Sequence, residues 1–114
     1  MKMSISTHVL DTSAGRPAAG VAVRLQRLDG ETWRDVSHAD TNADGRVAAL
    51  LPAGAPAAPG AFRLTFDVAG YFTARGQETF YTTVTIDFVV RDAAQHFHVP
   101  LLLSPFGYST YRGS

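Results

Sequence analysis

The side chains best suited to chemistry gather in the last nineteen residues of the chain, 96–114. Two histidines stand two positions apart, His96 and His98, and the chain ends in Tyr111-Arg112-Gly113-Ser114. A neutral imidazole can take up a proton near neutral pH, and tyrosine, arginine and serine offer hydrogen-bond donors. Chain ends are commonly frayed and tolerant of change. This composition therefore indicates a tail that is built into the protein, as strand, turn and strand.

Two interpretations of the end of this tail remain open. It is either an edge strand whose aromatic side chains pack on a sheet, or a lip that presents hydrogen-bonding groups to a ligand. The groups in question are the Tyr111 hydroxyl, the Arg112 guanidinium, and the hydroxyl and carboxylate of Ser114. Gly113 would let the backbone bend sharply or approach a ligand closely.

The histidines could also bind a metal. On a strand, His96 and His98 would share one face, and His8 could complete a zinc site. The sequence places no carboxylate where it would orient such ligands, so we predict no metal and no other cofactor. His38 and His96 are interpreted as hydrogen-bonded surface groups, whereas a structural and a functional role remain open for the other two histidines.

The segment Asp40-x-Asn42-x-Asp44-Gly45 matches the opening of an EF-hand calcium loop. The twelfth position, which should be a bidentate glutamate, is Leu51, and no flanking helix is predicted. The segment is instead interpreted as a turn rich in Asx residues that places Arg46 at the start of a strand.

Hydrophobic periodicity predicts an all-β protein. Alternation of apolar and polar residues predicts strands over 4–10, 21–28, 31–37, 47–51, 61–68 and 83–90, with two more in the tail. Asp29-Gly30 predicts a tight hairpin, 52–60 a surface loop, and 70–80 contains a short helix. These elements favour an eight-stranded β-sandwich with one short helix, in a single domain that spans residues 1–114.

Composition narrows the class of protein further. A chain of 114 residues has room for one core. Its formal net charge of zero argues against nucleic-acid binding. There is no cysteine for disulfides or thiolate chemistry. Neither a secretory signal nor an apolar stretch long enough to cross a membrane is visible, so we expect no membrane partner and a cytoplasmic location.

Four motifs give the chain a resemblance to the transthyretin-like family, in its hydrolase branch rather than its hormone-carrier branch. They are Ser6-Thr7-His8-Val9-Leu10-Asp11, Thr41-x-x-Asp44-Gly45-Arg46, the segment 96–105, and the Tyr111-Arg112-Gly113-Ser114 end. The resemblance implies a transthyretin-like sandwich and a homotetramer with active sites at the interface between dimers. It also implies hydrolysis of 5-hydroxyisourate to 2-oxo-4-hydroxy-4-carboxy-5-ureidoimidazoline, in the degradation of urate to allantoin.

The resemblance also implies roles for particular residues. The substrate-binding positions of the family fall on His8, Arg46 and Tyr111. Its second histidine falls on His98 and its terminal serine on Ser114, which gives a catalytic set of His8, Arg46, His98 and Ser114. The chain shows no departure at these motif positions.

The chemistry of ring opening is consistent with these residue types. Hydrolysis of a cyclic amide needs an attacking water, a base for its proton, and donors for the oxyanion. His98 or His8 is the candidate base, and the residues alone do not rank them. Arg46 is the best donor, because its guanidinium stays charged and planar. The alternative is a non-catalytic carrier of small ligands on the same sandwich, whose pocket would be apolar.

Overall fold

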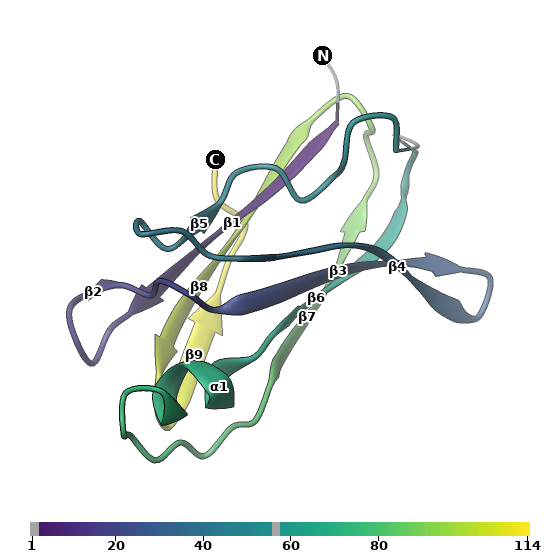
Figure 1. The fold of residues 1–114 in the computed structure, drawn as a ribbon. Coiled ribbons are helices and arrows are strands. Elements are labelled where there is room, and N and C mark those ends of the chain that lie inside the picture. The colour runs from purple at the N-terminus through teal and green to yellow at the C-terminus, as the bar shows by residue number, and fades with distance from the viewer. Residues whose placement is uncertain (1–2, 56–57) are drawn as a thin grey trace.

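The computed structural model describes residues 3–55 and 58–114. Its elements are β1 (Ser4–Asp11), β2 (Arg16–Pro17), β3 (Ala22–Asp29), β4 (Thr32–Asp40), β5 (Arg46–Val47), β6 (Gly60–Phe66), α1 (Val68–Thr73), β7 (Val84–Val90), β8 (His96–Ser104) and β9 (Gly107–Thr110). They form two packed sheets, shown in Figure 1, with the start of β1 and the C-terminus away from α1. The predicted all-β sandwich with a short helix is confirmed.

One sheet has the strand order β2-β1-β8-β9, with β5 also paired to β1, and the other has the order β4-β3-β6-β7. Within the first sheet, β1 and β8 run parallel, although 92 residues separate Ser4 from its partner His96. The hairpin predicted at Asp29-Gly30 joins β3 to β4, and Gly30 takes the positive φ of 63° that its turn requires. The tail forms β8, a turn and β9, as predicted.

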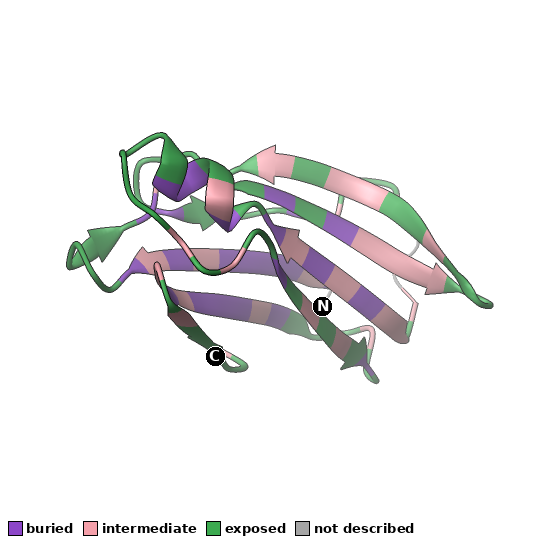
Figure 2. Cartoon of the chain, turned by 90° about the horizontal axis from the view of Figure 1, so that it is seen from below, coloured by how far each residue is buried: buried purple, intermediate pink, exposed green. Residues whose placement is uncertain are grey.

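The core lies between the two sheets, and the alternation along each strand decides which side chains enter it. On β6, Phe62, Leu64 and Phe66 are fully buried, as the period-two pattern predicts. Figure 2 shows the same banding of buried and less buried residues along the strands. Each fully buried side chain of this size contributes about 1.5–3 kcal/mol relative to exposure. The strands β1 and β8 also bury side chains in this core, so packing between the sheets holds them in place.

Several boundaries differ from the sequence prediction. The strand expected over 47–51 is only Arg46–Val47, because the chain then turns inward, buries Leu50 and bonds its amide to the carbonyl of Ile5 (2.9 Å). The helix predicted within 70–80 is Val68–Thr73, since the Asp67 side chain caps it by accepting from the amide of Gly70 (3.0 Å). The turn predicted over 11–17 contains β2. Residues 56 and 57 of the predicted loop 52–60 lie outside the described residues.

Asp11, at the end of β1, is a buried charged group that ties the helix to the sheet. Its carboxylate accepts hydrogen bonds from the Tyr71 hydroxyl (2.8 Å) and from Ser13 and Ala14. Burial raises the pKa of Asp11, but the hydrogen bonds from Ser13, Tyr71 and Ala14 outweigh it, and the net pKa lies below the usual value. The strand that carries His8 is therefore anchored firmly at its far end.

Candidate active site

Neighbouring strands bring three of the histidines to the outer face of the first sheet. Ile5, Val9, Phe97 and Val99 are buried in the core, so the alternate residues on β1 and β8 point outward. The parallel register pairs Ser6 with His98 and His8 with Pro100. Ser6, His8, His96 and His98 therefore share this face, away from the core.

Arg46 reaches the same face from β5. The antiparallel register sets Arg46 directly beside His8. The turn before it is the predicted Asx turn, because the Asn42 side chain accepts hydrogen bonds from the amides of Asp44 (2.9 Å) and Arg46 (3.0 Å). Gly45 is required here, since its φ is +74° and a Cβ would lie 2.4 Å from the carbonyl oxygen of Val9.

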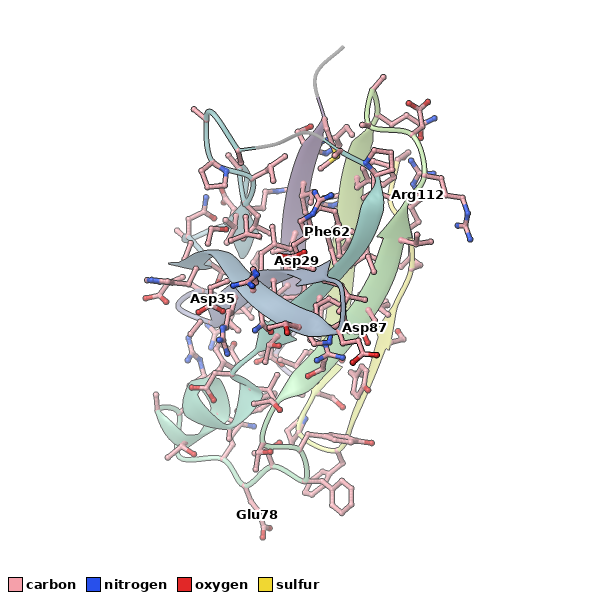
Figure 3. All side chains as sticks on the ribbon, turned by 90° about the vertical axis from the view of Figure 1, so that its right-hand side faces the viewer. Asp29, Asp35, Phe62, Glu78, Asp87 and Arg112 are labelled. Carbon is pink, nitrogen blue, oxygen red and sulfur yellow. The ribbon has the colours of Figure 1, made fainter. Side chains whose placement is uncertain are left out.

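The C-terminal residues fold back onto β8 and complete the group. The amide of Gly113 donates to the carbonyl of His98 (2.8 Å), which forms an isolated bridge between the two residues. Arg112 donates to the Gln95 side chain (2.9 Å), and its guanidinium lies 4.8 Å from the centre of the Phe97 ring. Figure 3 shows Arg112 at the opposite end of the sandwich from Glu78, on the loop after α1. The contacts of Gly113 with His98 and of Arg112 with Gln95 and Phe97 hold the tail against the sheet.

A cavity of about 290 Å³ opens on this face. It is lined by Ser6, Thr7, Arg46, Val47, Ala48, His96, His98 and Ser114. The structure thus brings together three of the predicted site residues, Arg46, His98 and Ser114, with His8 beside Arg46 on the same face. The polar side chains that line this cavity can bind a small molecule with several carbonyl groups.

Tyr111 is placed differently. It is 57% exposed and lines a second cavity of about 270 Å³, between the tail and β7. His98 lines both cavities, so it is shared between the cavity of Tyr111 and the cavity of Ser114. Within one chain, the predicted substrate-binding tyrosine therefore lies outside the cavity that Arg46 lines.

His98 has the most distinctive environment of the site residues. Its Nδ1 lies 2.7 Å from the Ser6 hydroxyl oxygen. Burial lowers the pKa of His98, and electrostatic interactions with Arg46, His96 and His8 lower it further. The imidazole is accordingly neutral at neutral pH and can accept a proton.

The described residues, 3–55 and 58–114, contain no group of three or more His, Cys, Asp or Glu side chains that could hold a metal ion. The His96 and His98 rings stack with centroids 6.3 Å apart and planes at 16°. Their nitrogens contact Ser4 and Ser6. The His96 side chain is hydrogen-bonded at the surface, as predicted.

Ser6 is the polar contact that sequence reasoning missed. The signal was available, because alternation along β1 already places Ser6 on the same face as His8. The histidines that Ser6 contacts could not be predicted, because these contacts depend on the pairing of β1 with β8. The close approach of Gly113 to His98 was likewise hidden until the tail was seen to fold back.

Gly113 offers a direct test of the contact between tail and histidine. A Cβ at this position would lie 2.5 Å from Cδ2 of His98, so we expect Gly113→Ala to displace the ring or the tail. The hydrolytic activity that the family resemblance implies should fall by up to about 100-fold, because a shift of a positioned group by about 1 Å can cost that much. Gly107→Ala is the matched control, because its Cβ would meet only Ser104 Oγ at 3.6 Å. Equal activity of the two variants would contradict a tight contact at His98.

The fold and this face define a class of protein: a transthyretin-type β-sandwich whose outer sheet face carries a polar, cationic site suited to hydrolysis. Comparisons with known proteins identify the family within this class. A model of the HIUase/Transthyretin family matches residues 5–113. A 5-hydroxyisourate hydrolase from Caulobacter vibrioides is 49% identical over 114 residues, which cover 96% of this chain and 97% of that protein.

Solved structures give the same result. A 5-hydroxyisourate hydrolase from Klebsiella pneumoniae superimposes with a TM-score of 0.85 at 42% identity, covering 98% of this chain and 94% of that one. Sea bream transthyretin in complex with thyroxine gives a TM-score of 0.89 at 27% identity, covering 96% and 94%. The chain therefore belongs to the HIUase/Transthyretin family, and it is an enzyme.

Proposed function

We propose that this chain hydrolyses 5-hydroxyisourate, opening its six-membered ring to give 2-oxo-4-hydroxy-4-carboxy-5-ureidoimidazoline, a step in the degradation of urate to allantoin. Relatives that carry the hydrolase name at 42–49% identity over nearly the whole chain support this activity. The observation that carries the proposal is the gathering of Arg46, His98 and Ser114 around one polar cavity, with His8 beside them. Residues 1–114 would act as one hydrolase domain.

In the mechanism we propose, His98 is the general base. Its lowered pKa supports this role, because the neutral imidazole can take a proton from the attacking water. The water oxygen adds to the ring carbonyl carbon, the carbon–nitrogen bond breaks, and the proton passes to the leaving nitrogen. Arg46 would stabilise the oxyanion through its planar, permanently charged guanidinium.

The remaining site residues would bind and orient the substrate. His8 lies beside Arg46 on the same face and could hydrogen-bond a ring carbonyl or nitrogen. Ser114 lines the cavity and could orient the water through its hydroxyl or its carboxylate. Tyr111, which lines the second cavity beside His98, would bind the substrate from the same chain or from a neighbouring one.

The carrier function is the alternative, and the sea bream transthyretin structure with thyroxine gives it a basis in the same fold. A carrier of apolar ligands would need an apolar pocket. The cavity here is lined by Arg46, two histidines and two serines. That lining favours the hydrolase over the carrier.

The decisive experiment follows the absorbance of freshly generated 5-hydroxyisourate with and without the protein. Decay should be faster with the wild-type chain in proportion to its concentration, and EDTA should leave the rate unchanged. Decay at the uncatalysed rate would overturn the proposed function. Loss of activity with EDTA that returns on addition of zinc would overturn the metal-free mechanism.

The assembly implied by the resemblance is part of the proposal: a homotetramer with sites at the interface between dimers. The cavity opens on the outer face of a sheet, where a second copy could close it. Large aromatic side chains also remain exposed in the single chain, with Phe80 at 73% and Phe106 at 66%. Light scattering should give four times 12.2 kDa, and a fully active monomer would contradict a shared site.

The pH dependence of hydrolysis tests the base. Because the pKa of His98 is lowered from 6.5, the imidazole stays neutral in more acidic solution than an ordinary histidine. The acidic limb of kcat/KM should therefore have its midpoint below pH 6.5. Initial rates from about pH 5 to about pH 8, with the uncatalysed decay subtracted, measure it. A midpoint above 6.5 would contradict His98 as the base in this environment.

No helix among the described residues is long and apolar enough to cross a membrane. A cytoplasmic location remains our prediction from the sequence, and cell fractionation would test it.

A further inference from the structure

A line of hydrogen bonds runs from His98 to the edge of the sheet. The Ser6 hydroxyl oxygen lies 2.7 Å from Nδ1 of His98 and 3.0 Å from Nε2 of His96. Nδ1 of His96 in turn contacts the Ser4 hydroxyl. The order is therefore His98, Ser6, His96, Ser4, with a serine hydroxyl next to each histidine nitrogen in the line.

The chemistry of a hydroxyl leaves three arrangements for this line. Ser6 has one hydrogen and two lone pairs, so it cannot donate to both histidines at once, although it can accept from both. If His98 donates from Nδ1 to Ser6, Ser6 either donates to Nε2 of His96, which donates from Nδ1 to Ser4, or accepts from Nε2 of His96, which accepts at Nδ1 from Ser4. The lone pair of His98 is then on Nε2. In the reverse direction, His98 would carry its hydrogen on Nε2 and could not act as a base through that nitrogen.

The surroundings of His98 favour the arrangements in which it donates from Nδ1. The charged or titratable groups around it are Arg46 from β5, His8 from β1 and His96 from its own strand, and Ser114 of the tail lines the same cavity. A guanidinium is a donor with no acceptor, so beside Arg46 a lone pair is more favourable than an N–H group. Ser6 is only 8% exposed, whereas the contact between Ser4 and His96 is at the surface. The outward direction therefore places the free Ser4 hydroxyl hydrogen where water can accept it.

We propose that Ser6 and His96 are positioning residues that hold His98 as the tautomer with its hydrogen on Nδ1 and its lone pair on Nε2, facing the substrate. This inference rests on the proposed function, in which His98 is the base. Ser6 accepts from Nδ1 both before and after His98 takes the proton of water on Nε2. The line thus fixes the ring and stabilises the imidazolium that forms, as an orienting acceptor does for other catalytic histidines.

Kinetics of Ser6 variants test the positioning role. Ser6→Ala should lower kcat about 10- to 100-fold with little change in KM, the range found when the hydrogen bond that orients a metal-bound histidine is lost. The acidic limb of its pH profile should move to lower pH, because the imidazolium loses an acceptor. Ser6→Thr keeps the hydroxyl and should recover most of the activity. Thr65→Ala, which removes a hydroxyl from β6 in the other sheet, should behave like wild type.

A spectroscopic measurement reads the tautomer directly and does not depend on activity. The ¹⁵N chemical shifts of His98, assigned with a His98→Gln variant, should show hydrogen on Nδ1 in the wild-type protein and a mixture of tautomers in Ser6→Ala. Hydrogen on Nε2 in the wild type, or a Ser6→Ala variant with unchanged kcat and pH profile, would overturn the inference. If the wild type fails to hydrolyse 5-hydroxyisourate, the proposed function fails, while the tautomer can still be read.

Discussion

Arg46→Ala is expected to lower kcat/KM for 5-hydroxyisourate about 100- to 1,000-fold, the loss typical of removing one donor to an oxyanion. The physical reason is that, among the described residues that line the cavity, Arg46 alone carries a permanent positive charge. It sits opposite His8 through the register of β5 with β1, so alanine leaves the developing negative charge without its donor. Steady-state kinetics at saturating and limiting substrate would separate the loss in kcat from any change in KM.

The fold should tolerate this change. Arg46 is exposed, and surface substitutions of this kind usually alter stability by no more than about 0.5 kcal/mol. Arg24→Ala is the matched control, because Arg24 is an exposed strand arginine on the other sheet, paired with Asp35. It should retain full activity. A fall in thermal stability of Arg46→Ala that accounts for its lost activity would show that the arginine is structural.

Deleting residues 112–114 is expected to reduce activity about a thousandfold or more, since several positioned groups are lost together. The deletion removes Ser114 from the cavity, the bridge from Gly113 to His98, and the contact of Arg112 with Phe97. These residues are partly or fully exposed, so the core remains and the melting temperature should change little. The assay is the same absorbance decay, with thermal unfolding measured in parallel. Full activity of the truncated chain would show that residues 112–114 are not part of the active site.

Two smaller changes at Ser114 separate the contribution of its hydroxyl from that of the terminal carboxylate. Ser114→Ala keeps the terminal carboxylate and removes only the hydroxyl. A glycine-serine extension after Ser114 keeps the hydroxyl and moves the carboxylate away. If the carboxylate orients the water or a histidine, the extension should be the more damaging of the two. Any tag fused to this end should be treated as a mutation of the site.

Much of the fold follows from local pattern. Alternation on β6 predicted that Phe62, Leu64 and Phe66 enter the core, because side chains on a strand point to opposite faces in turn. The Asx turn before Arg46 was also readable, because asparagine bonds to nearby amides whatever surrounds it. The helix was located less well, since its start depends on a cap at Asp67 that competes with the preceding strand.

The amino-acid sequence by itself determined which residues share a face, which motifs the chain carries, and hence the family and the class of chemistry. Only the tertiary structure decided how those faces meet. Backbone hydrogen bonds between strands do not depend on side-chain type, so the parallel register that sets Ser6 beside His98 comes from core packing on both strands. The same packing folds the tail so that Ser114 lines the cavity with Arg46, while Tyr111 lines the second cavity.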